Sequence, residues 1–227
     1  MPTRRAALFR LPVGNDAARL AGILLAIAGF VFLMGVITAE AEYPHPYTTH
    51  ENEISDLGAT RPPGSISHQP SAAIFIATCL AVGAAILAAG VLLRRANAPR
   101  REWLTVGLLG LGVLGVGVFP GNMAPFHGLF AMLAFVSGGL AGVLAGTTLL
   151  GAFRYVSIAL GSIALGNLLV AFLSDLTPVW DELGDGGVER WIAYPVVLWL
   201  VAFGSFVAGS ESRPPFEAPA VQVGRNV

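Results

Sequence analysis

The side chains of this sequence that could do chemistry gather in three short segments. All four histidines and ten of the fourteen acidic residues lie within residues 40–70, 120–125 and 174–190 or at their edges. Imidazole and carboxylate groups carry out general acid–base catalysis, and both also bind zinc. The candidate catalytic residues are His127, Asp56 and Glu189, and the candidate zinc ligands are His127, His45, His50, His68, Asp56, Asp175 and Glu189.

The motifs that would support a zinc site or a serine hydrolase are absent from this sequence. The sequence has no HExxH and no paired cysteines, so the zinc hypothesis depends on residue types alone. A serine hydrolase would use Ser55 or Ser71 with a histidine and an aspartate, but no GxSxG elbow is present. We place the serine hydrolase below the metal site.

Each of the candidate residues His127, Asp56 and Arg190 also has a structural interpretation that involves no catalysis and no ligand. His127 can be an interfacial histidine that bonds to a loop carbonyl. Asp56 can form an ion pair with Arg61 or Arg190 that pins a long loop. Arg190 is a candidate binding residue for a lipid phosphate, because guanidinium matches phosphate oxygens, but an arginine at that depth can also extend to water.

The composition shows what must position these residues. The 227-residue chain is 55% hydrophobic and 12% charged, with a mean hydropathy of +0.70. Soluble domains carry about 25% charged residues. The net charge of −1 gives no basis for a nucleic-acid partner. The single cysteine excludes a disulfide within the chain. The sequence is therefore that of an integral membrane protein.

Six apolar stretches have the length of membrane helices, about 20 residues each. They predict an all-α bundle of six transmembrane helices. The expected spans are Leu20–Ala39, Ser71–Leu93, Trp103–Phe119, Phe126–Leu149, Val156–Leu173 and Trp191–Gly209.

Arginine predicts the direction of these spans. Eleven of the thirteen arginines lie before the first span, in alternate loops or in the tail, and the other two are Arg61 and Arg190. The positive-inside rule then places both termini in the cytoplasm of a prokaryotic plasma (inner) membrane. The expected organisation is an N-terminal segment 1–19, a membrane domain 20–209 with outer loops 40–70, 120–125 and 174–190, and a disordered tail 210–227. Ala39-Glu40-Ala41 has the form of a signal-peptidase site, but the apolar run before it favours an uncut helix.

Small residues predict close helix packing. Ala134, Gly138, Gly142 and Gly146 are four residues apart and share one helix face. We expect this face to pack within the bundle, and a homo-oligomer is the alternative. Asn167 lies inside the fifth span, so it should bond to another helix or contact a substrate.

The loop of residues 40–70 has features of local order. Tyr43, Tyr47, Ile54 and Leu57 can anchor it on the bundle. Ser55 or Asp56 can cap a short turn that Gly58 ends.

This loop also carries a resemblance. Ile54-Ser-Asp-Leu-Gly-Ala-Thr-Arg-Pro-Pro, followed by Ile74-Phe75, resembles the DRAM-like (damage-regulated autophagy modulator) membrane proteins, and more closely the prokaryotic family catalogued as domain of unknown function 998. Gly117–Pro120, His127 and Glu189-Arg190 are similar to the same pattern, which covers residues 20–209.

The resemblance implies a six-helix fold and no settled reaction. Eukaryotic relatives are associated with lipid remodelling, membrane lipid asymmetry and autophagy. The positions shared with the pattern are Ser55, Asp56, Gly58, Pro120, His127, Glu189 and Arg190.

The sequence leads to a ranked set of functions. The first is an outward-facing site that binds or modifies a lipid headgroup at the outer leaflet, with Arg190 on phosphate and His127, Asp56 and Glu189 in acid–base or zinc chemistry. An enzyme of this kind would be a metal-dependent hydrolase acting on lipid. The second is a non-catalytic scaffold that organises lipid or partners. The third is a neutral-solute transporter that uses Asn167.

Overall fold

A computed structural model describes residues 16–44, 46–149, 151–173 and 182–209. The candidates His45 and Asp175, the first fifteen residues and the tail lie outside these ranges. Within them the chain forms six long helices and one 3-10 turn. Their bounds are α1 Asp16–Ala41, η1 Ile54–Leu57, α2 Ser71–Arg95, α3 Arg100–Val118, α4 Ala124–Thr148, α5 Phe153–Phe172 and α6 Gly184–Gly209. All six long helices are long and apolar enough to cross a membrane, which confirms the predicted all-α class and the six spans.

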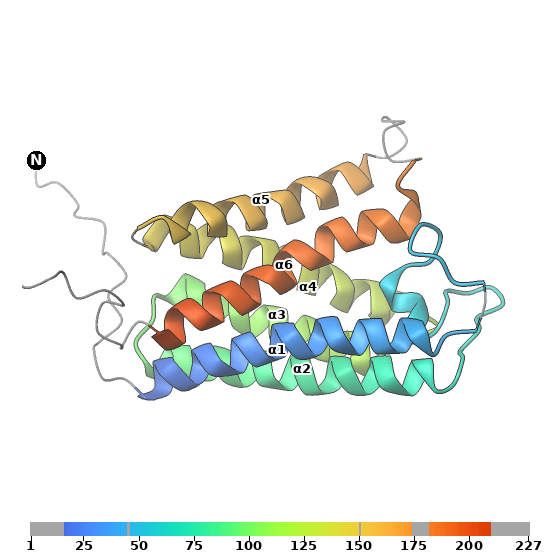
Figure 1. Ribbon diagram of the computed structural model, residues 1–227, viewed down its shortest axis with the longest axis horizontal. Coiled ribbons are helices and arrows are strands. Elements are labelled where there is room, and N and C mark those ends of the chain that lie inside the picture. The colour runs from blue at the N-terminus through green and yellow to red at the C-terminus, as the bar shows by residue number, and fades with distance from the viewer. Residues whose placement is uncertain (1–15, 45, 150, 174–181, 210–227) are drawn as a thin grey trace, which may run out of the picture.

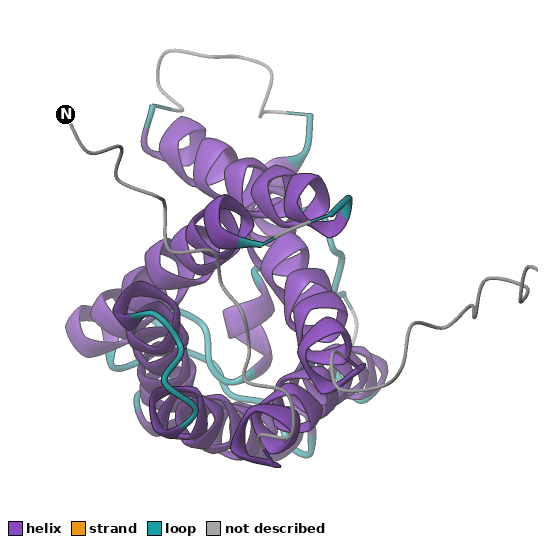
Figure 2. Cartoon of the chain, turned by 90° about the vertical axis from the view of Figure 1, so that its left-hand side faces the viewer, coloured by secondary structure: helices purple, strands orange, loops and turns teal. Residues whose placement is uncertain are grey.

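Five of the helices form a ring and the sixth lies outside it. Helices α1, α2, α3 and α4 pack in succession, α6 packs against α1, and α5 lies along α4 and α6 (Figure 1). Viewed along the bundle, the ring encloses the short η1 turn (Figure 2).

The two ends of the bundle differ. We call the end with the α1–α2 loop, the α3–α4 turn and the start of α6 the loop end, and the opposite end, with residues 94–101 and 149–154, the arginine end. Which end faces the cytoplasm stays a prediction from the arginine distribution.

The small-residue face of α4 packs within the chain. Gly142 lies against Gly161 of α5, and Gly138 lies against Val196 of α6. The hydroxyl of Ser157 on α5 donates to the Gly142 carbonyl at 2.7 Å. These contacts agree with packing inside the bundle, because backbone can approach backbone only where side chains are small. An oligomer stays a prediction, but these glycines are covered by the chain's own helices.

The start of α6 and the partner of Asn167 differ from the expectation. Helix α6 begins at Gly184 rather than Trp191, so residues 184–190, expected as part of a loop, are helical. This stretch is rich in glycine and acidic residues, and neither type is apolar. The apolar pattern therefore did not include these two turns of the helix. Asn167 on α5 donates to the Ile163 carbonyl of its own helix at 2.8 Å rather than to another helix. A polar side chain in a span can satisfy itself this way without a neighbour.

Candidate functional site

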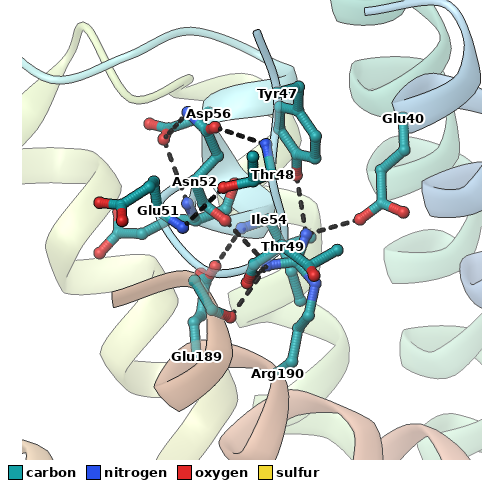
Figure 3. Close-up of polar contacts among 12 residues, drawn as sticks. Glu40, Tyr47, Thr48, Thr49, Glu51, Asn52, Ile54, Asp56, Glu189 and Arg190 are labelled. Atoms are coloured by element: carbon teal, nitrogen blue, oxygen red, sulfur yellow. Dashed lines mark hydrogen bonds and ion pairs between the residues drawn. The ribbon is translucent and has the colours of Figure 1, made fainter. Parts of the chain in front are cut away.

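Arg190 fastens the long loop to the start of α6. Its Nη1 donates to the carbonyl oxygens of Asn52 at 2.8 Å, Gly186 at 2.9 Å and Thr49 at 3.3 Å. Its Nη2 donates to Glu40 Oε1 at 2.6 Å and to the Tyr47 hydroxyl at 2.8 Å (Figure 3). The arginine is only 8% exposed. A buried guanidinium with this many acceptors fixes the loop against both α1 and α6.

The η1 turn sits under this loop and closes the ring. Ile54 and Leu57 are buried in an apolar cluster with Val36 of α1 and Phe75 of α2. This burial agrees with the predicted anchoring by Ile54 and Leu57, since apolar area is removed from water. Gly58 follows the turn at its C-cap, as the sequence predicts.

Asp56 holds the turn rather than facing the cavity beneath it. Its Oδ2 accepts the backbone N–H of Glu53 at 3.1 Å and the side-chain amide of Asn52 at 3.4 Å. Neither Arg61 nor Arg190 pairs with it among the described ion pairs. Arg61 bonds to Glu53 at 2.7 Å instead. The predicted ion pair of Asp56 is therefore wrong: Arg61 pairs with Glu53 and Arg190 pairs with Glu40.

A cavity of about 60 Å³ lies directly below η1, on the axis of the ring. Three of its lining residues have polar side chains: Ser55 from η1, His127 from α4 and Glu189 from α6. Residues from all five ring helices and η1 line it: Phe32, Ile54, Phe75, Cys79, Val113, Val116, Ala131, Ala134, Phe135 and Ala193 complete the wall. Three of the residues singled out in the sequence therefore meet at one place, although they come from segments far apart in the chain.

His127 and Glu189 are both held in place by backbone groups. His127 is 4% exposed, and its Nδ1 lies 2.8 Å from the Phe119 carbonyl at the end of α3. A carbonyl only accepts, so Nδ1 carries the proton and Nε2 is left with a lone pair when the ring is neutral. Glu189 Oε2 accepts the N–H of Ile54. Each side chain is thus oriented by one bond and keeps a second polar atom for other partners.

The loop carries two perturbed groups of its own. Burial raises the pKa of the Tyr47 phenol, against the smaller opposing effect of Arg190. Tyr47 therefore keeps its proton and donates to the Glu53 carbonyl at 3.4 Å. Burial also raises the pKa of the Glu53 carboxyl, which Arg61 partly offsets. Both shifts follow from taking a charged form out of water.

The histidine-based zinc hypothesis finds no assembled site in the described part of the chain. There, no three side chains from histidine, cysteine, aspartate and glutamate come together to hold a metal. His50 bonds to Glu51 at 2.7 Å and to the Glu182 carbonyl at 3.2 Å, on the exposed side of the loop. His68 packs edge-on against the Tyr43 ring. His127 is therefore separate from both.

Four acidic or phenolic residues make contacts that the sequence did not predict. Glu40 and Tyr47 complete the Arg190 network, and Glu53 pairs with Arg61. Glu102 is buried at the arginine end, where its Oε1 accepts the Thr148 hydroxyl at 2.8 Å. Glu40 ends an apolar span and faces an arginine at the start of another, so a search for charge pairs between span ends could have found that pair.

The fold and the cavity define a class: a multi-pass membrane protein with six spanning helices and a largely apolar cavity beneath a fastened loop. The family model described as "Protein of unknown function (DUF998)" matches residues 26–205, and the chain belongs to this family. No curated protein and no solved structure matches the chain.

Proposed function

We propose that this protein binds a membrane lipid at the loop end and performs acid–base chemistry on the part of the lipid that enters the cavity. The observation that carries the proposal is the meeting of Ser55, His127 and Glu189 in one otherwise apolar cavity. A structural bundle has no need to bring an imidazole, a carboxyl and a hydroxyl to the same small space. Perturbed or convergent polar groups in an apolar pocket are the usual mark of a functional site.

The volume of the cavity restricts what it can hold. At about 60 Å³ it is less than half the size of the roughly 150 Å³ engineered cavity that accepts benzene. Small-molecule sites run to roughly 300–1,000 Å³. The cavity therefore accommodates a reacting group and a few water molecules, and the remainder of a lipid lies outside it.

The site residues have separate roles in this proposal. His127, whose Nδ1 proton is committed to Phe119, presents Nε2 as a base. Glu189 supplies the second acid–base group, and Ser55 contacts the substrate. Arg190 acts as a positioning residue. Its two terminal nitrogens are already engaged by five acceptors, so a lipid phosphate would have to displace the loop. If the arginine end is cytoplasmic, the site serves the outer leaflet.

The proposal is tested with the full chain reconstituted in vesicles of defined phospholipid composition. Lipids are followed by mass spectrometry for loss of substrate and gain of product. We expect turnover in the wild type and a fall of about 10²–10⁴-fold in His127→Ala and Glu189→Gln, the usual contribution of a general acid or base. His68→Ala, outside the cavity, is the matched histidine control. Unchanged turnover in well-folded His127→Ala, or no turnover in the wild type with any phospholipid, would refute the chemistry.

A further inference from the structure

The size of the cavity raises the question of where the rest of a lipid lies. The loop end is closed from above, because η1 covers the cavity and Arg190 fastens the loop over it. A lipid longer than the cavity must therefore leave it sideways, between two of the ring helices. The contacts between neighbouring helices show which pair allows this.

Most neighbouring helices are in close contact at the level of the cavity. Gly35 of α1 lies against Thr78 of α2, next to the cavity residue Cys79. Gly117 of α3 lies against Cys79 itself. Gly112 of α3 lies against the backbone of Ala134, another cavity residue. Glu40 and Arg190 join α1 to α6 above. The first three helix pairs are closed by the chain's own atoms beside the cavity, and α1 and α6 are joined above it.

Helices α4 and α6 meet lower down. Gly138 lies against Val196, one turn beyond the cavity residues Ala134 and Ala193 on the way to the arginine end. This contact forms a floor under the cavity. Above the floor, both α4 and α6 contribute residues to the cavity wall. The outer side of this pair is where α5 lies.

Helix α5 covers α4 only near and below this floor. Ile158, Leu165 and Phe172 are seven residues apart, so they share one face of α5. Ile158 contacts Gly146 and Leu165 contacts Gly139, but Phe172 is 67% exposed.

The facing side of α4 shows the same change. Gly128, Phe135 and Gly142 are also seven residues apart on one helix face. Gly142 lies against α5, whereas a side chain at Gly128 would meet no atom within 4 Å among the described residues. The C-terminal end of α5 lies well apart from α4 (Figure 1). The two helices therefore separate toward the loop end, and Phe135 lies both on this diverging face and in the cavity wall.

We propose that the space between α4 and the C-terminal turns of α5 holds one acyl chain of a membrane lipid, whose reacting end enters the cavity past Ala131 and Phe135. This inference rests on the proposed function and specifies its substrate class as a lipid that enters sideways from the bilayer. The exposed residues at the end of α5, Leu169 at 60% and Phe172 at 67%, are apolar, as an acyl chain requires. They lie in a helix that crosses the membrane, where acyl chains are the surrounding solvent.

Photolabelling tests the route without requiring turnover. The full chain is reconstituted in phosphatidylcholine vesicles that contain a phosphatidylcholine with a diazirine in one acyl chain, and labelled residues are mapped by mass spectrometry. We expect labelling of the cavity residues Ala131 and Phe135. Gly128→Trp fills the space and should lower that labelling at least fivefold. Gly166→Trp is the matched control, because Gly166 is equally open but its helical position turns it away from the α4-facing side of α5.

The outcomes separate this inference from the function on which it rests. Labelling of Ala131 and Phe135 that Gly128→Trp abolishes and Gly166→Trp leaves intact supports the acyl-chain site, even if no lipid is turned over. Labelling confined to residues outside the cavity, or loss that is equal in both tryptophan variants, overturns it, even if His127→Ala still abolishes turnover. Unchanged melting temperatures in detergent confirm that both variants are folded.

Discussion

The two ends of the bundle use the same six helices in different ways. At the arginine end, α5 packs closely on α4 and α6, and the interior is filled by Trp199, Phe203 and Leu93, each 0–1% exposed. At the loop end, α5 separates from α4, a cavity remains under η1, and a network of polar contacts lies above the apolar cluster of the turn. The two ends therefore differ in how their interiors are filled, and the proposed function places its site at the loop end.

Two buried carboxyl groups, Glu102 and Glu189, also differ between the two ends. Glu102 at the arginine end is 3% exposed and bonds to Thr148 at 2.8 Å and to Arg101 at 3.2 Å. Glu189 at the loop end bonds to a backbone N–H and faces a cavity. The first carboxyl is held by side chains, whereas the second is held by a backbone N–H and lines the cavity.

Removing Arg190 should have the largest effect and would break the loop end selectively. Arg190→Met leaves Glu40, two loop carbonyls and the Gly186 carbonyl of α6 without their donor. Breaking a buried ion pair from one side costs about 3–5 kcal/mol. We expect a lower melting temperature in detergent and rapid proteolysis within residues 46–60, with the arginine end still protected.

Arg61→Met is the matched control for that substitution. Its ion pair with Glu53 lies on the surface, with the Arg61 side chain 63% exposed. Such pairs contribute about 0–1 kcal/mol. Equal sensitivity of the two variants would show that Arg190 has no special place in the loop.

A bulky residue at Gly142 should have the next largest effect and would break the other end. Gly142→Leu forces α4 away from Gly161 and the Ser157 carbonyl. Overpacking of a core costs about 1–3 kcal/mol. Chemical denaturation in detergent measures the loss. Gly107→Leu, where no described atom lies within 4 Å of the new Cβ, is the control.

This variant also distinguishes a scaffold from a lipid-modifying protein. A scaffold should lose its assembly with Gly142→Leu and tolerate His127→Ala. A catalytic site should lose turnover with His127→Ala while the fold is kept. If Gly142→Leu changed neither stability nor assembly, the packing role of α4 would be refuted.

A smaller and pH-dependent effect is expected from Glu53. Because the pKa of this carboxyl is raised in the folded protein, its stabilising contribution is present below the unfolded pKa and is lost as pH rises through the folded pKa. We therefore expect amide exchange in residues 46–60, corrected for its intrinsic pH dependence, to speed up with rising pH. Glu53→Gln should flatten that dependence, and Glu42→Gln should not. Equal slopes in wild type and Glu53→Gln would count against the shift.

The sequence was enough for the helices but only partly for the site. Apolar length predicts all six spans, because lipid leaves the backbone few alternatives. Residue type and position also picked out Ser55, His127 and Glu189, which meet in the cavity. The sequence could not show that Glu189 faces the cavity while Arg190, its neighbour, faces the loop. That separation requires both to be helical, and the glycines at 184, 186 and 187 concealed the first turns of α6.

The hydrogen-bond partners of Arg190 could not be predicted from the sequence, for a different reason. Three of its five acceptors are backbone carbonyls, and every residue has one of these, so no pattern of side chains marks them. Only the fold brings them to one guanidinium. The same holds for the Phe119 carbonyl that orients His127.

The network of Arg190 also sets an order for biosynthesis. The arginine bonds to Asn52, which leaves the ribosome 138 residues earlier. At roughly 5–20 residues per second, the loop waits roughly 7 to 28 s for its anchor. The first five helices can insert and pack during that time, but the cavity stays without Glu189 and without a fastened cover. The site is thus completed only when the last helix is in place, and a chain truncated before α6 should never acquire it.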